Sequence, residues 1–209
     1  RLETIQRMMR SLGADEAMEY IETILSEDPA LTYRFLNHVN SAALGRRTGI
    51  DSLRHGLMML GYTSLQHWLR DQLAYASVAV NLKPVFSGMV LRAKLVEHLL
   101  DAGAEGDLQR ELYLCGLLSQ LDVLLGEPLP TILARLPLHE RVQDAILRND
   151  GPYAPYLSLA HSMETADTAQ TLALCAEAEL PLEEANRIML RMLDGLMLHR
   201  PLWASNGNS

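Results

Sequence analysis

An almost uninterrupted apolar stretch, LYLCGLLSQLDVLL, runs from Leu112 to Leu125. A helix that is apolar on every side is typical of a protein interior, because none of its faces gains from contact with water. The stretch is too short to cross a bilayer as a helix. The helical pattern begins at Asp107, just after Gly106. We therefore predict a buried central helix that starts at Asp107 and continues through this stretch.

Helical periodicity also governs the first part of the chain. Apolar residues recur at intervals of three or four between residues 2 and 12 and again between residues 18 and 25, which predicts two short amphipathic helices. Asp28 then places a capping carboxylate directly before Pro29, a residue suited to the first turn of a helix. A third helix should therefore begin there and end near Asn40-Ser41.

The remaining boundaries are also signalled by caps, glycines and prolines. Asp51 or Ser52 is suited to cap another helix, and Gly61 is suited to end it. Pro84 opens a long helix, and beyond Gly126 several prolines separate shorter helices. None of these segments is followed by a strand-like alternation of apolar and polar residues. The predicted fold class is all-α, a compact multi-helix bundle.

Composition and charge narrow the range of partners. The chain has 18 Lys and Arg against 26 Asp and Glu, a formal net charge of −8 and a pI of about 5.3. Such a charge opposes attraction to phosphate backbones and anionic lipids, so we expect neither nucleic acid nor a membrane as partner. Cys115 and Cys175 lie in apolar helical patterns far apart, which favours buried free thiols over a disulfide. The sequence shows no signal peptide or membrane span, so we expect a cytoplasmic location.

Several motifs resemble a known signalling domain. The run DPAL at residues 28–31 and the run LNHVNSA at 36–42 resemble the signature of HDOD domains. IDSL at 50–53 and MLG at 59–61 are similar to the next helix pair of that family. GLLSQLD at 116–122 resembles the segment that reads GLLHDIG in HD-type phosphohydrolases.

The resemblance covers roughly residues 2–198 and implies a particular fold and domain division. It implies an HD-like (HDOD) architecture with a degenerate metal site. On this interpretation residues 1–199 form one HDOD domain and residues 200–209 form a flexible C-terminal tail.

Three segments are most similar to one branch of the family, in which an HDOD domain follows an EAL domain, the phosphodiesterase module for cyclic di-GMP. These are QHWL at residues 66–69, LSQLD at 118–122 and LARLPL at 133–138. The resemblance implies a regulatory fragment of a longer protein in which an EAL domain precedes Arg1. The expected partner is a protein or a covalently attached EAL domain, and a homo-oligomer is compatible with the sequence.

The positions that would carry catalysis argue against an enzyme. Ser119 and Gln120 stand where the HD-type phosphohydrolases have their His-Asp pair, and both are poor metal ligands. None of the seven histidines is followed by Asp, and residues 86–89 lack the upstream ligand His. We expect no catalytic residues, no metal and no cofactor. Two alternatives remain open at this point: a divergent metal-dependent HD-type phosphohydrolase, and a nucleotide-binding receptor that uses the vestigial HD cleft.

A candidate interaction surface follows from the locally basic part of the chain. Arg46, Arg47 and Arg54 are close in sequence and could pair with the carboxylates of a partner. The nearby Asn40-Ser41 turn could form a recognition edge. For Asn40 and Ser41 we favour a structural interpretation, in which both side chains bond the local backbone, and for the arginines a solvated loop.

Overall fold

The computed structural model of the chain describes residues 2–14, 16–42, 49–73, 83–100, 106–165 and 167–198. The side chains of residues 42, 83 and 195–198 are not described. The described ranges contain thirteen α-helices and no strand. The helices are α1 (Leu2–Gly13), α2 (Met18–Ser26), α3 (Pro29–Ala42), α4 (Leu53–Leu60), α5 (Tyr62–Leu73), α6 (Lys83–Leu99), α7 (Gly106–Leu118), α8 (Leu121–Leu125), α9 (Leu129–Leu133), α10 (Glu140–Arg148), α11 (Ala154–Thr165), α12 (Thr168–Glu177) and α13 (Leu182–Leu198). The prediction of an all-α fold is confirmed.

Local hydrogen bonds at the helix ends confirm the predicted caps. The carboxylate of Asp28 accepts a hydrogen bond from the backbone N–H of Leu31 at 3.0 Å. Ser52, one of the two residues predicted to cap α4, accepts from the N–H of His55 at 3.2 Å. Gly61 follows α4 with a φ of +76°, a conformation that glycine adopts without steric cost. These ends depend on neighbouring residues alone, so they could be predicted from sequence.

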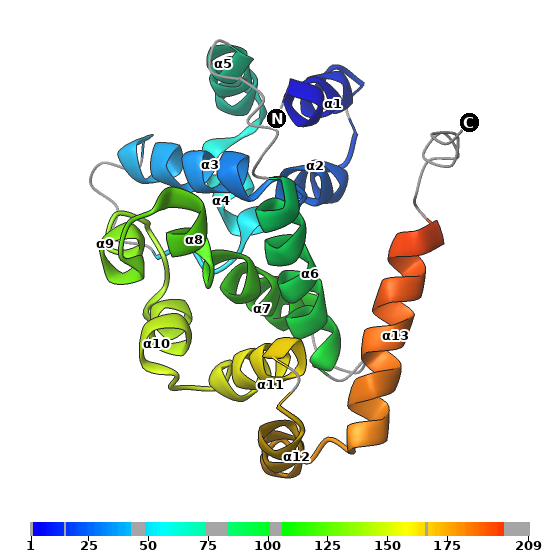
Figure 1. Cartoon of the computed structure of the whole chain (residues 1–209). Helices are drawn as coiled ribbons and strands as arrows, with labels where there is room; N and C mark the ends of the chain where they lie inside the picture. Colours follow the sequence, from blue (N-terminus) through cyan, green and yellow to red (C-terminus); the bar gives the residue numbers. More distant parts are fainter. Residues whose placement is uncertain are drawn as a thin grey trace.

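The helices α6 and α7 cross at the centre of the molecule and share its most extensive helix–helix contact (Figure 1). Gly116 of α7 makes this crossing close. A Cβ atom at Gly116 would lie only 2.7 Å from Cα of Ala93 and 3.3 Å from the backbone oxygen of Arg92. The backbones of α6 and α7 are therefore in direct contact at Gly116, which has no side chain.

The predicted central helix proves to be two helices. Residues 106–118 form α7, Ser119 and Gln120 form a turn, and α8 begins at Leu121. The backbone N–H of Ser119 still bonds to Cys115, but the hydroxyl of Ser119 donates to the carbonyl oxygen of Gly116 at 2.8 Å. The chain turns away after this bond. Leu117, Leu118 and Leu121 are fully buried as expected, whereas α8 also exposes Val123.

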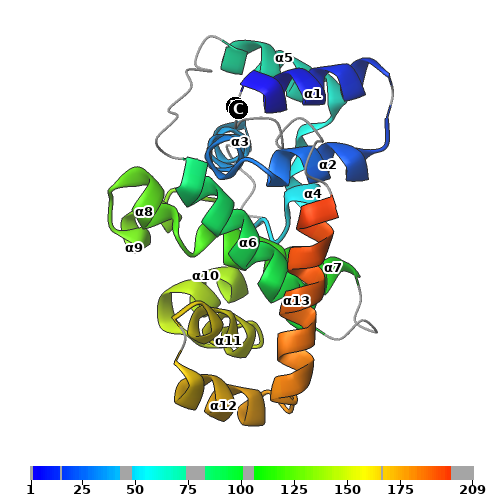
Figure 2. The ribbon, with the colours of Figure 1, turned by 45° about the vertical axis from the view of Figure 1, so that its right-hand side comes forward.

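The other helices pack at both ends of this pair. α1, α2 and α5 lie at one end, and α10, α11 and α12 lie at the other, while α13 runs alongside α6 (Figure 2). Phe35 of α3 and Trp68 of α5 are buried and meet edge to face, with ring centroids 5.6 Å apart. Cys115 and Cys175 are buried free thiols, as predicted.

A short backbone pairing joins the two halves of the chain. The N–H of Ile50 donates to the carbonyl of Pro137, and the N–H of His139 donates to the carbonyl of Ile50 at 2.8 Å. Gly49 fits against this segment because a Cβ atom there would lie 2.8 Å from Cα of His139. The pairing fixes the entry to α4 beside the entry to α10.

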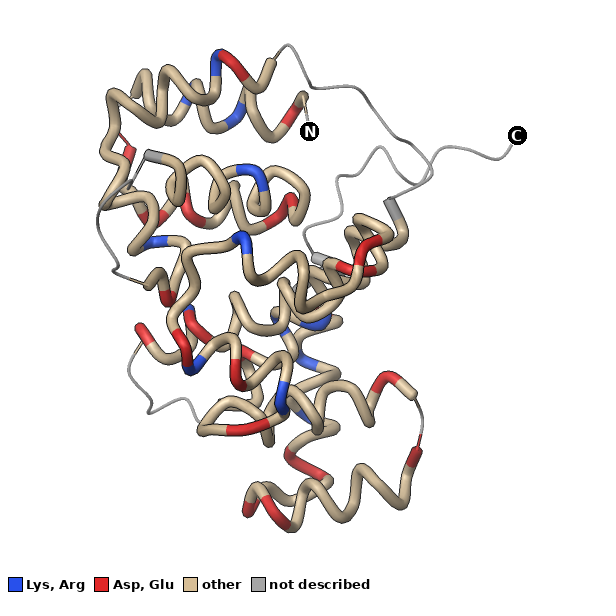
Figure 3. Tube along the Cα trace, turned by 90° about the vertical axis from the view of Figure 1, so that its left-hand side faces the viewer, with Lys and Arg blue, Asp and Glu red and all other residues tan. Residues whose placement is uncertain are grey.

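Charged residues are spread over the described surface, but α12 and the turns beside it carry only acidic ones (Figure 3). This distribution agrees with the low proportion of basic residues in the sequence. In the part of the chain that the structure describes, no helix is both long and apolar enough to cross a membrane.

The close crossing of α6 and α7 predicts that Gly116→Ala destabilises the fold by about 1–3 kcal/mol, because the added methyl group would push the backbones apart. The measurement is urea unfolding followed by circular dichroism. Gly88→Ala is the matched control, because Gly88 lies in α6 with open space around its Cα and the substitution should be neutral or slightly stabilising. Equal midpoints for the two variants would contradict the close crossing.

Candidate functional site

The two degenerate positions, Ser119 and Gln120, lie together against the guanidinium group of Arg92 from α6. Nη1 of Arg92 lies 3.4 Å from the hydroxyl oxygen of Ser119. With its amide oxygen turned toward the guanidinium, Gln120 accepts hydrogen bonds from Nη1 and Nη2 at 3.2 and 2.8 Å. The two residues expected at the degenerate metal positions therefore contact the cationic side chain of Arg92.

Two residues of α11 complete this cluster. The carboxylate of Glu164 accepts from Nε of Arg92 at 2.8 Å and also from Nη2, a forked arrangement suited to guanidinium and carboxylate. Nδ1 of His161 lies 3.4 Å from Nη2 of Arg92. Because arginine only donates hydrogen bonds, Nδ1 is the acceptor in this contact, and Nε2 carries the ring proton. Arg92 thus links α6, the α7–α8 turn and α11.

The residues of this cluster do not fit a divalent metal. Its one imidazole and its one carboxylate, on His161 and Glu164, both face the positive charge of Arg92. A metal ion there would stand beside a fixed cation and would have Ser119 and Gln120 as its nearest other donors. Among the residues that the structure describes, no group of three or more His, Cys, Asp or Glu could hold a metal ion.

Arg92 was not identified as a functional residue from the sequence, although its position in the helical pattern of α6 indicates that it is buried. Met89, Ala93 and Val96 are buried on one face of α6, and Arg92 falls in phase with them. An arginine at a core position needs a buried partner, because a buried charge is costly when unpaired. The sequence therefore contained a reason to look for its carboxylate, but not the identity of Glu164, which lies 72 residues further on.

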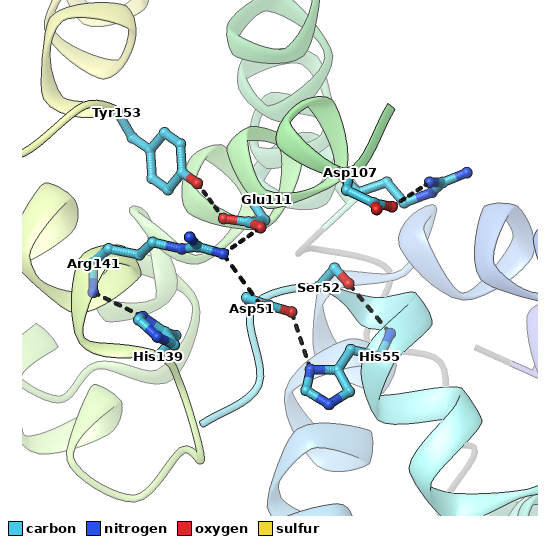
Figure 4. A network of polar contacts seen from close by, with 9 residues as sticks. Asp51, Ser52, His55, Asp107, Glu111, His139, Arg141 and Tyr153 are labelled. Carbon is cyan, nitrogen blue, oxygen red and sulfur yellow. Dashed lines mark hydrogen bonds and ion pairs between the residues drawn. The ribbon is translucent and has the colours of Figure 1, made fainter. Parts of the chain in front are cut away.

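A second polar network surrounds Glu111, a buried carboxylate on α7 (Figure 4). One oxygen of Glu111 accepts from Nη2 of Arg141 at 2.6 Å, and the other accepts from the hydroxyl of Tyr153. The same Nη2 lies 3.3 Å from the carboxylate of Asp51, whose other oxygen is 3.0 Å from Nδ1 of His55. The network therefore ties α7 to α10, to Tyr153 and to the segment before α4.

Burial sets the protonation of two groups near Glu111. It raises the pKa of the Tyr153 phenol, and the hydrogen bond to Glu111 raises that pKa further, so the phenol remains a donor. Burial also raises the pKa of the Cys115 thiol, which makes a reactive thiolate unfavourable. These groups stabilise the interior and offer no reactive centre.

The residues proposed as an interaction surface have mixed placements. Ser41 donates to the carbonyl oxygen of Asn37 at 3.0 Å, the expected local bond. The same expectation is wrong for Asn40, whose side chain donates to the carbonyl oxygen of Arg135 at 2.9 Å. Arg54 forms an ion pair with Glu19 of α2 and is mostly buried. Arg46 and Arg47 lie outside the described residues.

Comparison with known proteins places these features in context. The sequence pattern of the HDOD domain family matches residues 2–135. The chain is 27% identical over 172 residues to the cyclic di-GMP phosphodiesterase CdgJ of Vibrio cholerae, covering 81% of this chain and 39% of that protein. It is 28% identical over 182 residues to YuxH of Bacillus subtilis, covering 84% of this chain and 42% of that protein. The chain thus spans about two fifths of the length of these relatives.

The fold also occurs in a solved structure. The response regulator MmoQ of Methylococcus capsulatus superposes with a TM-score of 0.65, over 90% of this chain and 95% of that one. Sequence identity is only 17%, so this likeness shows the shared fold alone. It extends well beyond residue 135 and therefore includes helices that follow the family match.

The forked contact between Arg92 and Glu164 predicts that Arg92→Lys destabilises the protein by about 1–3 kcal/mol, because an ammonium group cannot reproduce the paired donors. Urea unfolding measures the loss. Arg148→Lys serves as control, since Arg148 is 68% exposed and pairs only with Asp144 on the same helix. That change should stay within about 0.5 kcal/mol. Equal effects at the two sites would show that Arg92 is not a buried link.

Proposed function

Because this chain belongs to the HDOD domain family, we propose that it is a non-catalytic signalling domain that regulates a cyclic di-GMP phosphodiesterase by direct contact. The observation that carries this proposal is the position of Arg92. At the two places where a related phosphohydrolase would hold its metal ligands, this chain has Ser119 and Gln120, and both contact a guanidinium group. Side chains that contact a buried guanidinium group support the structure and are poorly placed to hold a metal ion.

The partner we propose is an EAL-type phosphodiesterase module, in the same polypeptide or separate from it. CdgJ, one of the similar proteins, is a cyclic di-GMP phosphodiesterase, and this chain spans 39% of its length. We take residues 1–199 as the regulatory domain, since the last described helix, α13, extends to Leu198 and packs against α6. We place the protein in the cytoplasm, where the free thiols Cys115 and Cys175 would stay reduced.

Regulation of this kind requires a difference in binding. The domain must contact two states of the phosphodiesterase with different affinity, because equal affinity shifts no equilibrium. A coupling free energy of about 1–3 kcal/mol would change activity roughly 5- to 150-fold. The contact surface we propose is the stretch after α3 that contains Arg46 and Arg47, beside the exposed Asn40 and Ser41. Arg54 contributes less than its sequence position suggested, since Glu19 already pairs with it.

A divergent phosphohydrolase is the competing function, and a direct assay separates the two. We expect the purified chain to hydrolyse no phosphodiester or phosphomonoester above background with Mg²⁺, Mn²⁺, Fe²⁺ or Zn²⁺ added, because the one carboxylate and the one imidazole of the Arg92 cluster stand beside a fixed positive charge. The assay should include Ser119→Ala as a matched variant. Hydrolysis that needs metal and falls in Ser119→Ala would refute a non-catalytic role.

Regulation is tested by measuring cyclic di-GMP hydrolysis by an EAL phosphodiesterase of the same organism. If one polypeptide contains both the phosphodiesterase and this chain, that polypeptide is assayed. If they are separate proteins, the two are mixed. Removing the chain should change the rate by roughly 5- to 150-fold. Changing Arg46 and Arg47 to Glu should move the rate toward that of the enzyme alone, because the new carboxylates would repel the acidic groups of a partner.

The control for this experiment is Arg148→Glu, an exposed charge reversal on α10 that should leave regulation intact. Equal rates with and without the chain would overturn the proposed function. A regulatory effect that survives the change at Arg46 and Arg47 would instead refute only the proposed surface.

A further inference from the structure

A cleft of about 300 Å³ opens between α6, the α7–α8 turn, α10 and α11. Its polar lining comes from Arg92, Ser119, Asn149, Ser158 and His161. The volume is at the small end of the range for pockets that bind small molecules. Figure 2 shows α10 and α11 next to each other below α6, and α11 packs against α6 while α10 packs against α7. The cleft therefore lies beside the degenerate His-Asp positions and is lined by residues from both halves of the chain.

Arg92 presents a buried positive charge to this cleft. The residue is 9% exposed, and Glu164 engages its Nε and Nη2 atoms. Gln120 accepts from Nη1 at 3.2 Å and from Nη2 at 2.8 Å. On the cleft side, Nη1 lies 3.4 Å from Ser119 and Nη2 lies 3.4 Å from His161. Both of these distances exceed the usual range of about 2.7–3.2 Å for such bonds. The contacts of the guanidinium that face the cleft are therefore its longest ones.

Asn149 contributes a second donor. It ends α10 in the left-handed conformation with a φ of 52°, and the hydroxyl of Ser158 donates to its Oδ1 atom at 2.7 Å. This bond orients the amide and leaves its Nδ2 group with no acceptor among the described residues. An oriented amide N–H₂ at the edge of a cleft is suited to bind an oxygen atom of a ligand.

His161 contributes a third donor. Its Nδ1 faces the donor Nη2 of Arg92, so Nε2 carries the ring proton. The ring is exposed at the cleft, and Nε2 has no partner among the described residues. The carboxylate of Glu164 is occupied by Arg92. The cleft therefore offers unpaired donors on Asn149 and His161 beside the guanidinium of Arg92.

We propose that this cleft binds a small oxyanion, the phosphate or carboxylate group of a small metabolite. Such a group has several acceptor oxygens and a negative charge, which complement a buried guanidinium flanked by neutral donors. The volume leaves room for the anionic group and a small organic body. This ligand site belongs to the domain itself and does not depend on the proposed phosphodiesterase partner.

Isothermal titration calorimetry on the chain tests the proposal with three probes: inorganic phosphate, acetate and guanosine monophosphate, each at low ionic strength matched with chloride. We expect saturable binding of at least one probe. Phosphate without acetate would identify a phosphate site, and tighter binding of the mononucleotide than of phosphate would identify a nucleotide as the source of the anion. Absence of binding by all three probes at millimolar concentration would overturn the proposal.

The double variant Asn149→Gly/His161→Ala locates the binding site. Glycine keeps the left-handed conformation at residue 149, and His161 is exposed, so the fold should persist and can be checked by thermal unfolding. Loss of two donors to an anion should weaken binding roughly 10- to 100-fold. His98→Ala is the matched control, because it removes an exposed imidazole that does not line this cleft. Equal affinity in the double variant and the control would refute a site in this cleft.

Discussion

The close crossing of α6 and α7 at Gly116 is the constraint on which the rest of the molecule depends. The absence of a side chain there lets Cα of Ala93 approach the α7 backbone, and Arg92 immediately precedes Ala93. Ser119 lies three residues after Gly116, about one helical turn away. The crossing therefore places the guanidinium of Arg92 above the end of α7, next to Ser119 and Gln120. With a wider spacing between the helices, the same residues could not form this cluster.

The Arg92 cluster gives a physical interpretation of the degenerate His-Asp positions. A metal site assembles helices around a positive charge, and its ligands bridge elements that are distant in sequence. Here a guanidinium group, attached covalently to α6, holds the α7–α8 turn and α11 through Gln120 and Glu164. In this way a helical bundle can be held together at its centre by polar contacts, without residues that bind a metal. The network of Glu111, Arg141 and Tyr153 stabilises the same helix, α7, with a second ion pair, in which Glu111 is the buried partner.

These two ionic clusters bear on how the domain could transmit a signal. Both connect segments from the first and second halves of the chain through one buried charged group, Arg92 in one cluster and Glu111 in the other, and a buried charge is costly to separate from its partners. A ligand or partner that altered one contact would therefore act on several segments that this charge holds together. The oxyanion cleft opens directly on the Arg92 cluster, so its occupancy would act on the link between α6 and α11.

The sequence by itself determined what depends on neighbouring residues. The caps at Asp28 and Ser52 and the stop at Gly61 are local, and the burial of Leu117 and Leu118 follows from an unbroken apolar run. Family motifs were enough to indicate an HDOD domain, and the match over residues 2–135 confirms it.

Only the tertiary structure decided which distant groups meet. The partner of Arg92 on α11, the bond from Asn40 to Arg135 and the turn at Ser119 that ends α7 depend on packing between helices. No local pattern encodes such pairs, because a side chain finds its partner only after the helices between them have been placed.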